Sequence, residues 1–220
     1  MEYEVRFYYS KSELEKIINT LKEIPKLHSN MRLYEKTIQY NHSDKMYDFY
    51  SKNIDGRFRL RISKNDLFNK CKLSWKRRMK NHTKNIVNVE EEKEVKIEPD
   101  DIENLIYIIE NVMHFKIVES YERYRTIFEN NDIEIAVDEY PFGICLEVEN
   151  KSLDKNATEV VKYWVNQIGL DINDAYHLSW DDKYEELCKE QNITCYKELT
   201  FDKEMPNVNN QFRIKERSMQ

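Results

Sequence analysis

Charged and apolar side chains alternate along several short segments of the chain, and within each segment the charges have one sign. Arginine occupies every second position in residues 57–62, and glutamate does so in residues 146–149. Successive side chains of a β-strand point to opposite faces, so each segment predicts a strand with one charged and one apolar face. Acidic rows offer oxygen ligands for a metal ion, and basic rows offer donors for phosphate groups.

A charged strand face is commonly the solvent-exposed face of an open antiparallel sheet, and this alternative stays open for each strand taken alone. Solvent-exposed faces usually mix both signs, however, because like charges in a row repel one another. Segregated rows have a physical reason if they converge. Carboxylates would then hold a divalent cation, and arginines and lysines would neutralise a polyphosphate. The pattern therefore favours a phosphoryl-transfer site.

The order of the charged motifs resembles that of the CYTH group, or triphosphate tunnel metalloenzymes. The motifs are, in chain order, Glu2-Tyr-Glu4-Val-Arg6, Phe58-Arg59-Leu60-Arg61, Leu73-Ser-Trp-Lys76, Glu92-Lys-Glu94, Arg123-Tyr-Arg125, Asp138 and Glu147-Val-Glu149. A weaker likeness continues to Glu198-Leu-Thr-Phe201. Position 6 departs from the family, because arginine replaces the usual lysine and substitutes a planar fork for a compact charge. Val89 and Glu90 also stand where the family commonly has an arginine.

The resemblance implies a role for each of these side chains. One or two Mg²⁺ or Mn²⁺ ions would be held by Glu2, Glu4, Asp138, Glu147 and Glu149. The triphosphate would be held by Arg6, Arg59, Arg61, Lys76, Arg123 and Arg125. Arg6 and Lys76 are also expected to be catalytic, with Glu92 and Glu94 as supporting acidic residues. For Glu90 and Glu91, a solvated strand edge remains an alternative interpretation.

The resemblance implies metal-dependent hydrolysis of a triphosphate inside a tunnel, the substrate being inorganic triphosphate or a nucleoside or thiamine triphosphate. A class IV adenylate cyclase is the first alternative, in which the ribose 3′-hydroxyl of ATP attacks the α-phosphorus and yields cyclic AMP and pyrophosphate. A binding module that senses a polyphosphate or nucleotide without turnover is the second. The same cations and the same basic residues would serve all three, so the sequence leaves them open.

Periodicity predicts the elements that must position these residues. Alternation of period two predicts eight strands, over residues 2–9, 33–40, 57–62, 71–78, 86–97, 116–128, 132–139 and 144–150. Helices are predicted over 12–24, 99–112, 156–168 and from Ser179, capped by Asp182, to Gln191. The resemblance implies an α+β fold, a closed eight-stranded antiparallel β-barrel with helices packed outside. We expect one CYTH-like tunnel domain over 1–202 and a polar, flexible tail over 203–220.

Composition narrows the class of protein further. The formal net charge of -6 argues against a general nucleic-acid binder, which needs an excess of basic residues. The 4 cysteines show no C-x-x-C pair, which suits a reducing compartment, and no apolar stretch approaches the length of a membrane helix. We therefore expect a cytoplasmic protein whose partner is a small-molecule triphosphate. The sequence carries no sign of its oligomeric state.

Overall fold

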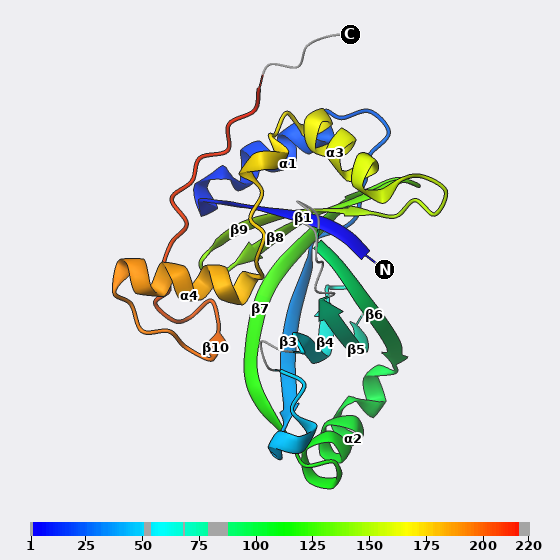
Figure 1. Ribbon diagram of the computed structural model, residues 1–220, viewed down its shortest axis with the longest axis vertical. Coiled ribbons are helices and arrows are strands. Elements are labelled where there is room, and N and C mark those ends of the chain that lie inside the picture. Colours follow the sequence, from blue (N-terminus) through cyan, green and yellow to red (C-terminus); the bar gives the residue numbers. More distant parts are fainter. Residues whose placement is uncertain (1, 51–53, 68, 79–87, 216–220) are drawn as a thin grey trace.

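The computed structural model describes residues 2–50, 54–67, 69–78 and 88–215. The side chains of Glu2, Arg78, Asn88 and Val89 lie outside the described part. All eight predicted strands and four predicted helices are present (Figure 1). The strands are β1 (Glu2–Tyr9), β3 (Leu33–His42), β4 (Gly56–Lys64), β5 (Asn69–Arg78), β6 (Asn88–Ile97), β7 (Phe115–Glu129), β8 (Ile133–Tyr140) and β9 (Gly143–Asn150), with two short additions, β2 (His28–Ser29) and β10 (Glu198–Leu199).

The helices are α1 (Leu14–Lys22), α2 (Ile102–Tyr107, continued by a π-helix over Ile108–Val112), α3 (Ala157–Ile168) and α4 (Trp180–Gln191). The predicted capping box of α4 forms, because the Asp182 carboxylate accepts from the backbone N–H of Ser179 at 3.0 Å. Asn156 caps α3, and Gly169 ends it with a φ of 90°. Across the described ranges, none of these helices has the length and apolar character of a membrane span.

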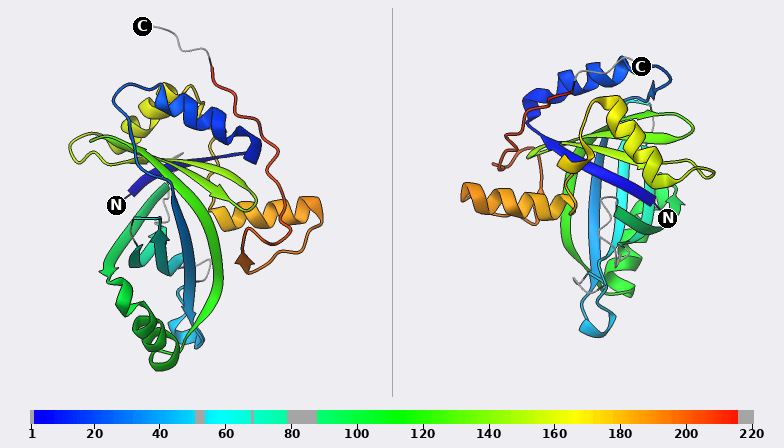
Figure 2. Two further views of the ribbon diagram at one scale, coloured as in Figure 1. Left: turned by 180° about the vertical axis from the view of Figure 1, so that it is seen from behind. Right: turned by 45° about the horizontal axis from the view of Figure 1, so that its top comes forward.

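The eight predicted strands form one antiparallel sheet in the order β7-β3-β4-β5-β6-β1-β9-β8, and β8 pairs again with part of β7. The sheet curls into an open half-barrel (Figures 1 and 2), so the predicted closed barrel is wrong. Within the described residues, β1 pairs with β6 from Glu2↔Glu90 to Glu4↔Asn88. Further along β1, the Arg6 carbonyl accepts from the backbone N–H of Tyr176 at 2.7 Å, so the segment before α4 occupies this part of the β1 edge.

The hydrophobic core lies outside the half-barrel. Apolar residues of β1, β8 and β9 pack against α1 and α3, as Val5 and Ile135 do with Leu21 and Val161. On the same outer face, over β4 and β5, Ile109 packs on Leu60 and its neighbours. Helices thus cover the apolar faces, as predicted, and leave the charged faces of the same strands to point inward.

The C-terminal segment differs from the predicted flexible tail. Met205, Val208 and Phe212 are buried, and the segment runs from β10 back toward α1 (Figure 1). The Phe212 ring meets the Tyr9 ring edge-on with centroids 5.2 Å apart, and the Lys16 ammonium donates to the Phe212 carbonyl at 2.5 Å. These three apolar residues and the hydrogen bond from Lys16 hold the segment against the core. Residues 216–220 lie outside the described part.

Phe212→Ala tests whether this segment contributes to stability. We expect the free energy of unfolding to fall by about 3–5 kcal/mol, because the substitution leaves a cavity in the core. Gln211→Ala, at the exposed neighbouring position, should change it by less than about 0.5 kcal/mol. Urea denaturation followed by circular dichroism measures both. Equal stability of the two variants would show that the segment is not part of the cooperative fold.

Candidate functional site

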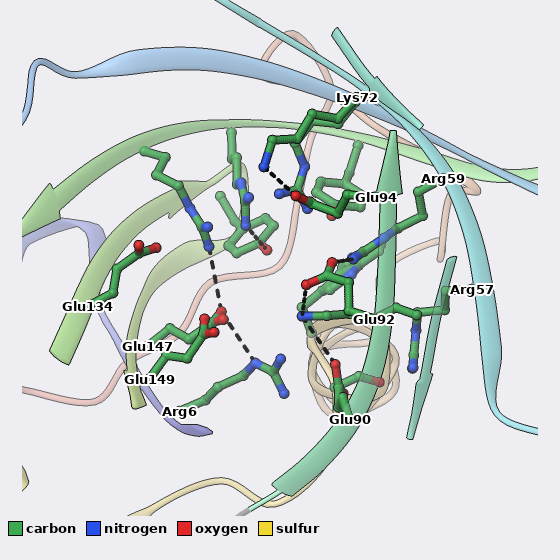
Figure 3. A pocket seen from close by; sticks show the side chains of 18 residues that line it. Arg6, Arg57, Arg59, Lys72, Glu90, Glu92, Glu94, Glu134, Glu147 and Glu149 are labelled. Carbon is green, nitrogen blue, oxygen red and sulfur yellow. Dashed lines mark hydrogen bonds and ion pairs between the residues drawn. The ribbon is translucent and has the colours of Figure 1, made fainter. Parts of the chain in front are cut away.

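Inward-facing side chains of the half-barrel line a charged cavity of about 210 Å³ (Figure 3). Its cationic lining consists of Arg6, Arg57, Arg59, Arg61, Lys72, Lys76, Arg123 and Arg125. Its acidic lining consists of Glu90, Glu92, Glu94, Glu134, Glu147 and Glu149, and Tyr121, Tyr140, Ser179 and Trp180 complete the wall. All six basic residues that the sequence predicted for phosphate binding are therefore brought together in one cavity.

Three carboxylates gather at the side of the cavity formed by β1 and β9. One ligand atom from each of Glu4, Glu147 and Glu149 lies within 4.8 Å of the others, and we call this group the acidic cluster. The register explains it, because Glu4 pairs with Glu149 and Arg6 with Glu147 across the two strands. Glu4 is fully buried, and its Oε2 atom has no hydrogen-bond partner within the described structure. Converging carboxylates with an unsatisfied oxygen fit a hard cation such as Mg²⁺ or Mn²⁺.

Neighbouring charges shift the pKa values of Glu4 and Glu147, two members of the acidic cluster, in opposite directions. Burial raises the pKa of Glu4, and the charges of Glu147 and Glu90 raise it further against the opposing effect of Arg6. Burial also acts to raise the pKa of Glu147, but Arg6 and Arg125 outweigh it and hold that pKa well below the usual range. The two pKa shifts are therefore opposite in direction, and a divalent cation bound at the acidic cluster would favour the ionised form of both carboxyl groups.

Arg6 connects the acidic cluster to the basic lining. Its guanidinium donates to Glu4, and its Nε atom lies 3.5 Å from Glu147 Oε2. Burial acts to lower the pKa of Arg6, but the charges of Glu4 and Glu147 outweigh it and raise the pKa, so the guanidinium stays charged. Glu2, the fourth carboxylate predicted in this region, pairs with Glu90 through the backbone, and its side chain lies outside the described residues.

Asp138 was predicted as a metal ligand, but the structure gives it other partners. The side chain is fully buried, and its two oxygens accept three N–H groups. Arg125 donates from Nε and Nη2, both at 2.6 Å, and Arg123 donates from Nη1 at 2.7 Å. Asp138 is not among the three carboxylates of the acidic cluster found in the described part of the chain. It therefore orients two arginines of the cavity wall.

Glu35 holds Arg123 from the opposite side, and the sequence interpretation missed it. Its carboxylate accepts from Arg123 Nε at 2.8 Å and from the Ser63 hydroxyl at 2.7 Å. Burial acts to raise the pKa of Glu35, but Arg123 and Arg61 outweigh it and lower that pKa. The sequence did contain a signal for Glu35, because polar residues alternate at Glu35, Thr37 and Gln39 along the predicted strand. In the structure all three are buried.

The acidic strand β6 faces the acidic cluster across the cavity (Figure 3). Its glutamates pair with the cations of β4 and β5: Lys76 Nζ lies 3.3 Å from Glu90 Oε2, Arg59 Nη2 lies 3.8 Å from Glu92 Oε1, and Lys72 Nζ lies 2.7 Å from Glu94 Oε2. Glu92 and Glu94 thus lie in the predicted region. Glu90 is buried, so the alternative of a solvated edge is wrong for this residue. Arg57 and Lys72 share the predicted basic faces but fall outside the family motifs.

Comparisons with known proteins identify the fold. No protein-family model matches the sequence, and the search of curated proteins gave no match. Among solved structures, the PH1819 protein of Pyrococcus horikoshii is 21% identical, with 87% of this chain and 99% of that chain covered and a TM-score of 0.62. A candidate adenylate cyclase from Vibrio parahaemolyticus is 16% identical over 82% of this chain and 96% of its own, with a TM-score of 0.58.

The candidate adenylyl cyclase HpAC1 of Hippeastrum, described as having a dominant triphosphatase activity, is 14% identical over 91% of this chain and 100% of its own, with a TM-score of 0.55. At these identities the likeness shows a shared fold. The resemblance inferred from the order of the charged motifs is thereby confirmed at the level of the fold.

Asp138→Asn separates a role in orienting arginines from a role in metal binding. In EDTA we expect the free energy of unfolding to fall by about 3–5 kcal/mol, because two buried arginines lose a negative partner. Glu149→Gln removes a like charge from the acidic cluster and should change it by less than about 1 kcal/mol. Urea denaturation in EDTA measures both. An Asp138→Asn variant as stable as the wild type without metal would contradict the orienting role.

Proposed function

We propose, from the shared fold of the CYTH group and the residues of the cavity, that this protein hydrolyses a triphosphate in a reaction that depends on a divalent metal ion. One observation carries the proposal: Glu147 and Glu149 of the acidic cluster line the same cavity of about 210 Å³ as eight arginines and lysines, with Glu4 buried next to them. A cation at the carboxylates and a polyphosphate along the basic wall would each neutralise one half of this arrangement.

The basic residues of the proposed site suit phosphate binding because most of them are arginines and because carboxylates hold some of them in place. Arg59 and Arg61 leave β4 on the same face, and Arg123 and Arg125 leave β7 on the same face. Guanidinium groups bind phosphate oxygens through paired N–H donors, which fixes orientation as well as charge. Asp138 and Glu35 hold Arg123 in place before any substrate arrives, so little rearrangement is required on binding.

In the proposed reaction Glu4, Glu147 and Glu149 would hold Mg²⁺ or Mn²⁺. When bound, such an ion supplies charge neutralisation for phosphate oxygens and lowers the pKa of a coordinated water. The arginines of β4 and β7 would stabilise the negative charge that spreads over the phosphate oxygens in the transition state. Arg6 and Lys76, which lie next to carboxylates on opposite sides of the cavity, are the proposed catalytic cations.

Cyclisation of ATP is the second candidate function, and a neighbouring cavity that could hold the nucleoside supports it. This cavity, of about 800 Å³, shares Arg57 and Trp180 with the first and has Tyr50, Tyr184 and Tyr196 in its wall. Its volume is large enough for a nucleoside. The fold is also that of candidate cyclases, one of them described as mainly a triphosphatase. Binding without turnover is the third reading of the same residues.

Product analysis separates these activities. Purified protein is incubated with inorganic triphosphate or with ATP, in Mg²⁺, Mn²⁺ or EDTA, and the products are resolved by ion-exchange chromatography. We expect metal-dependent release of orthophosphate, reduced at least about 100-fold by the double substitution Glu147→Gln and Glu149→Gln, because the carboxylate ligands are lost. Glu139→Gln is the matched control, since that carboxylate bonds Arg32 at 2.5 Å and does not line the cavity.

Three other outcomes would contradict metal-dependent hydrolysis, each in a different way. Cyclic AMP with pyrophosphate from ATP would replace hydrolysis by cyclisation. Tight binding of triphosphate with no product, even in Mn²⁺, would support the binding module. Activity that survives both EDTA and the double substitution would refute the metal-dependent reaction.

A further inference from the structure

Tyr121 is an uncharged polar residue in a wall otherwise made largely of charged side chains. It lies on β7 and is 1% exposed. The strand register places it directly opposite Thr37, which lies opposite Arg61, which lies opposite Lys72. The four residues form one row across β7, β3, β4 and β5, and three of them, Tyr121, Arg61 and Lys72, line the cavity. Neither the charged motifs nor the proposed reaction gives Tyr121 a role.

The surroundings of Tyr121 fix its ring and place its phenol among cations. The ring lies 4.4 Å from Trp180 and 5.7 Å from Tyr140, measured between centroids. Arg59 and Arg61 from β4 and Arg123 from β7 all act on the phenol through their charges, and Thr37 of β3 forms a hydrogen bond with it. Thr37 also accepts from Arg61 Nε at 3.3 Å, so the phenol and one guanidinium share a support.

We propose that Tyr121 is a further substrate-binding residue, whose phenol O–H donates a hydrogen bond to an oxygen of the phosphate group held by Arg59, Arg61 and Arg123. This inference rests on the proposed binding of a triphosphate in the cavity. Each phosphate oxygen can accept several hydrogen bonds, so a neutral donor such as a phenol can bind it beside the guanidinium groups. In its ionised form the phenol would lose the donor and repel the anion.

The electrostatics of the cavity bring this ionisation into an accessible pH range. Burial alone would raise the pKa of Tyr121, but Arg61, Arg123 and Arg59 outweigh it and lower the pKa to about 8. The other groups facing the ring, Tyr140 from β8 and Trp180 from α4, carry no charge at neutral pH. Since the protonated phenol binds and the phenolate repels, affinity for triphosphate should fall as the pH rises above about 8.

Tyr121→Phe tests the inference, because it keeps the ring against Trp180 and removes the hydroxyl. Binding of inorganic triphosphate is measured by isothermal titration calorimetry from pH 6.5 to 9.5, a range chosen to span the relevant pKa. At pH 7 we expect binding about 10- to 100-fold weaker than in the wild type, the usual value of a hydrogen bond to a charged group. Above pH 8 the wild type should lose affinity faster than the variant, so that the two curves converge.

Tyr124→Phe is the matched control, since it makes the same change on the opposite face of β7, where the ring contacts Arg32. It should follow the wild-type curve at every pH. Ionisation of the triphosphate itself affects all three proteins equally and cancels in the comparison. A Tyr121→Phe variant that follows the wild-type curve would overturn the inference while leaving the proposed function intact. A wild type that binds no triphosphate at any pH would overturn both.

Discussion

Placing many arginines in one cavity requires that they have negative partners even when no ligand is bound. Removing a guanidinium from water costs several kcal/mol unless hydrogen bonds and opposite charge compensate it, and the cost grows when several cations crowd together. Arg123 shows the solution, because it lies between Glu35 and Asp138 and is almost fully buried. Buried carboxylates such as Glu35 and Asp138 are therefore required for the arginines to line the cavity.

The same requirement determines where the hydrophobic core lies. A strand with charged residues at alternate positions has only its other face left for apolar packing. Because the charged faces of the eight large strands turn inward, the apolar faces must be covered from outside, which α1, α2 and α3 do. The helices thus support the site as much as the strands do, because burial of the apolar faces under the helices keeps the charged faces on the inside.

Much of this arrangement could be predicted from the sequence, because alternation is a local property. It placed Arg59, Arg61, Arg123 and Arg125 on shared faces, and the order of the motifs indicated the fold. The arginine partners of Asp138 could not be predicted, because only the register of β8 against β7 shows that it lies opposite Arg125. The open side of the half-barrel was also beyond prediction, since it depends on which distant segment pairs with the edge of β1, as Tyr176 does with Arg6. Phe212 lies 203 positions after Tyr9, so the packing of the tail is purely tertiary.

The arginine at position 6 has a physical reason within this arrangement. A lysine ammonium is one compact charge, whereas the Arg6 fork reaches Glu4 with one nitrogen and Glu147 with another. These two glutamates lie close enough to repel each other, and the charge of Glu147 adds to burial in raising the pKa of Glu4. By bridging both, the guanidinium lowers their mutual repulsion and holds the acidic cluster together in the absence of a cation. An arginine at this position therefore favours an acidic cluster that is assembled before any ligand binds.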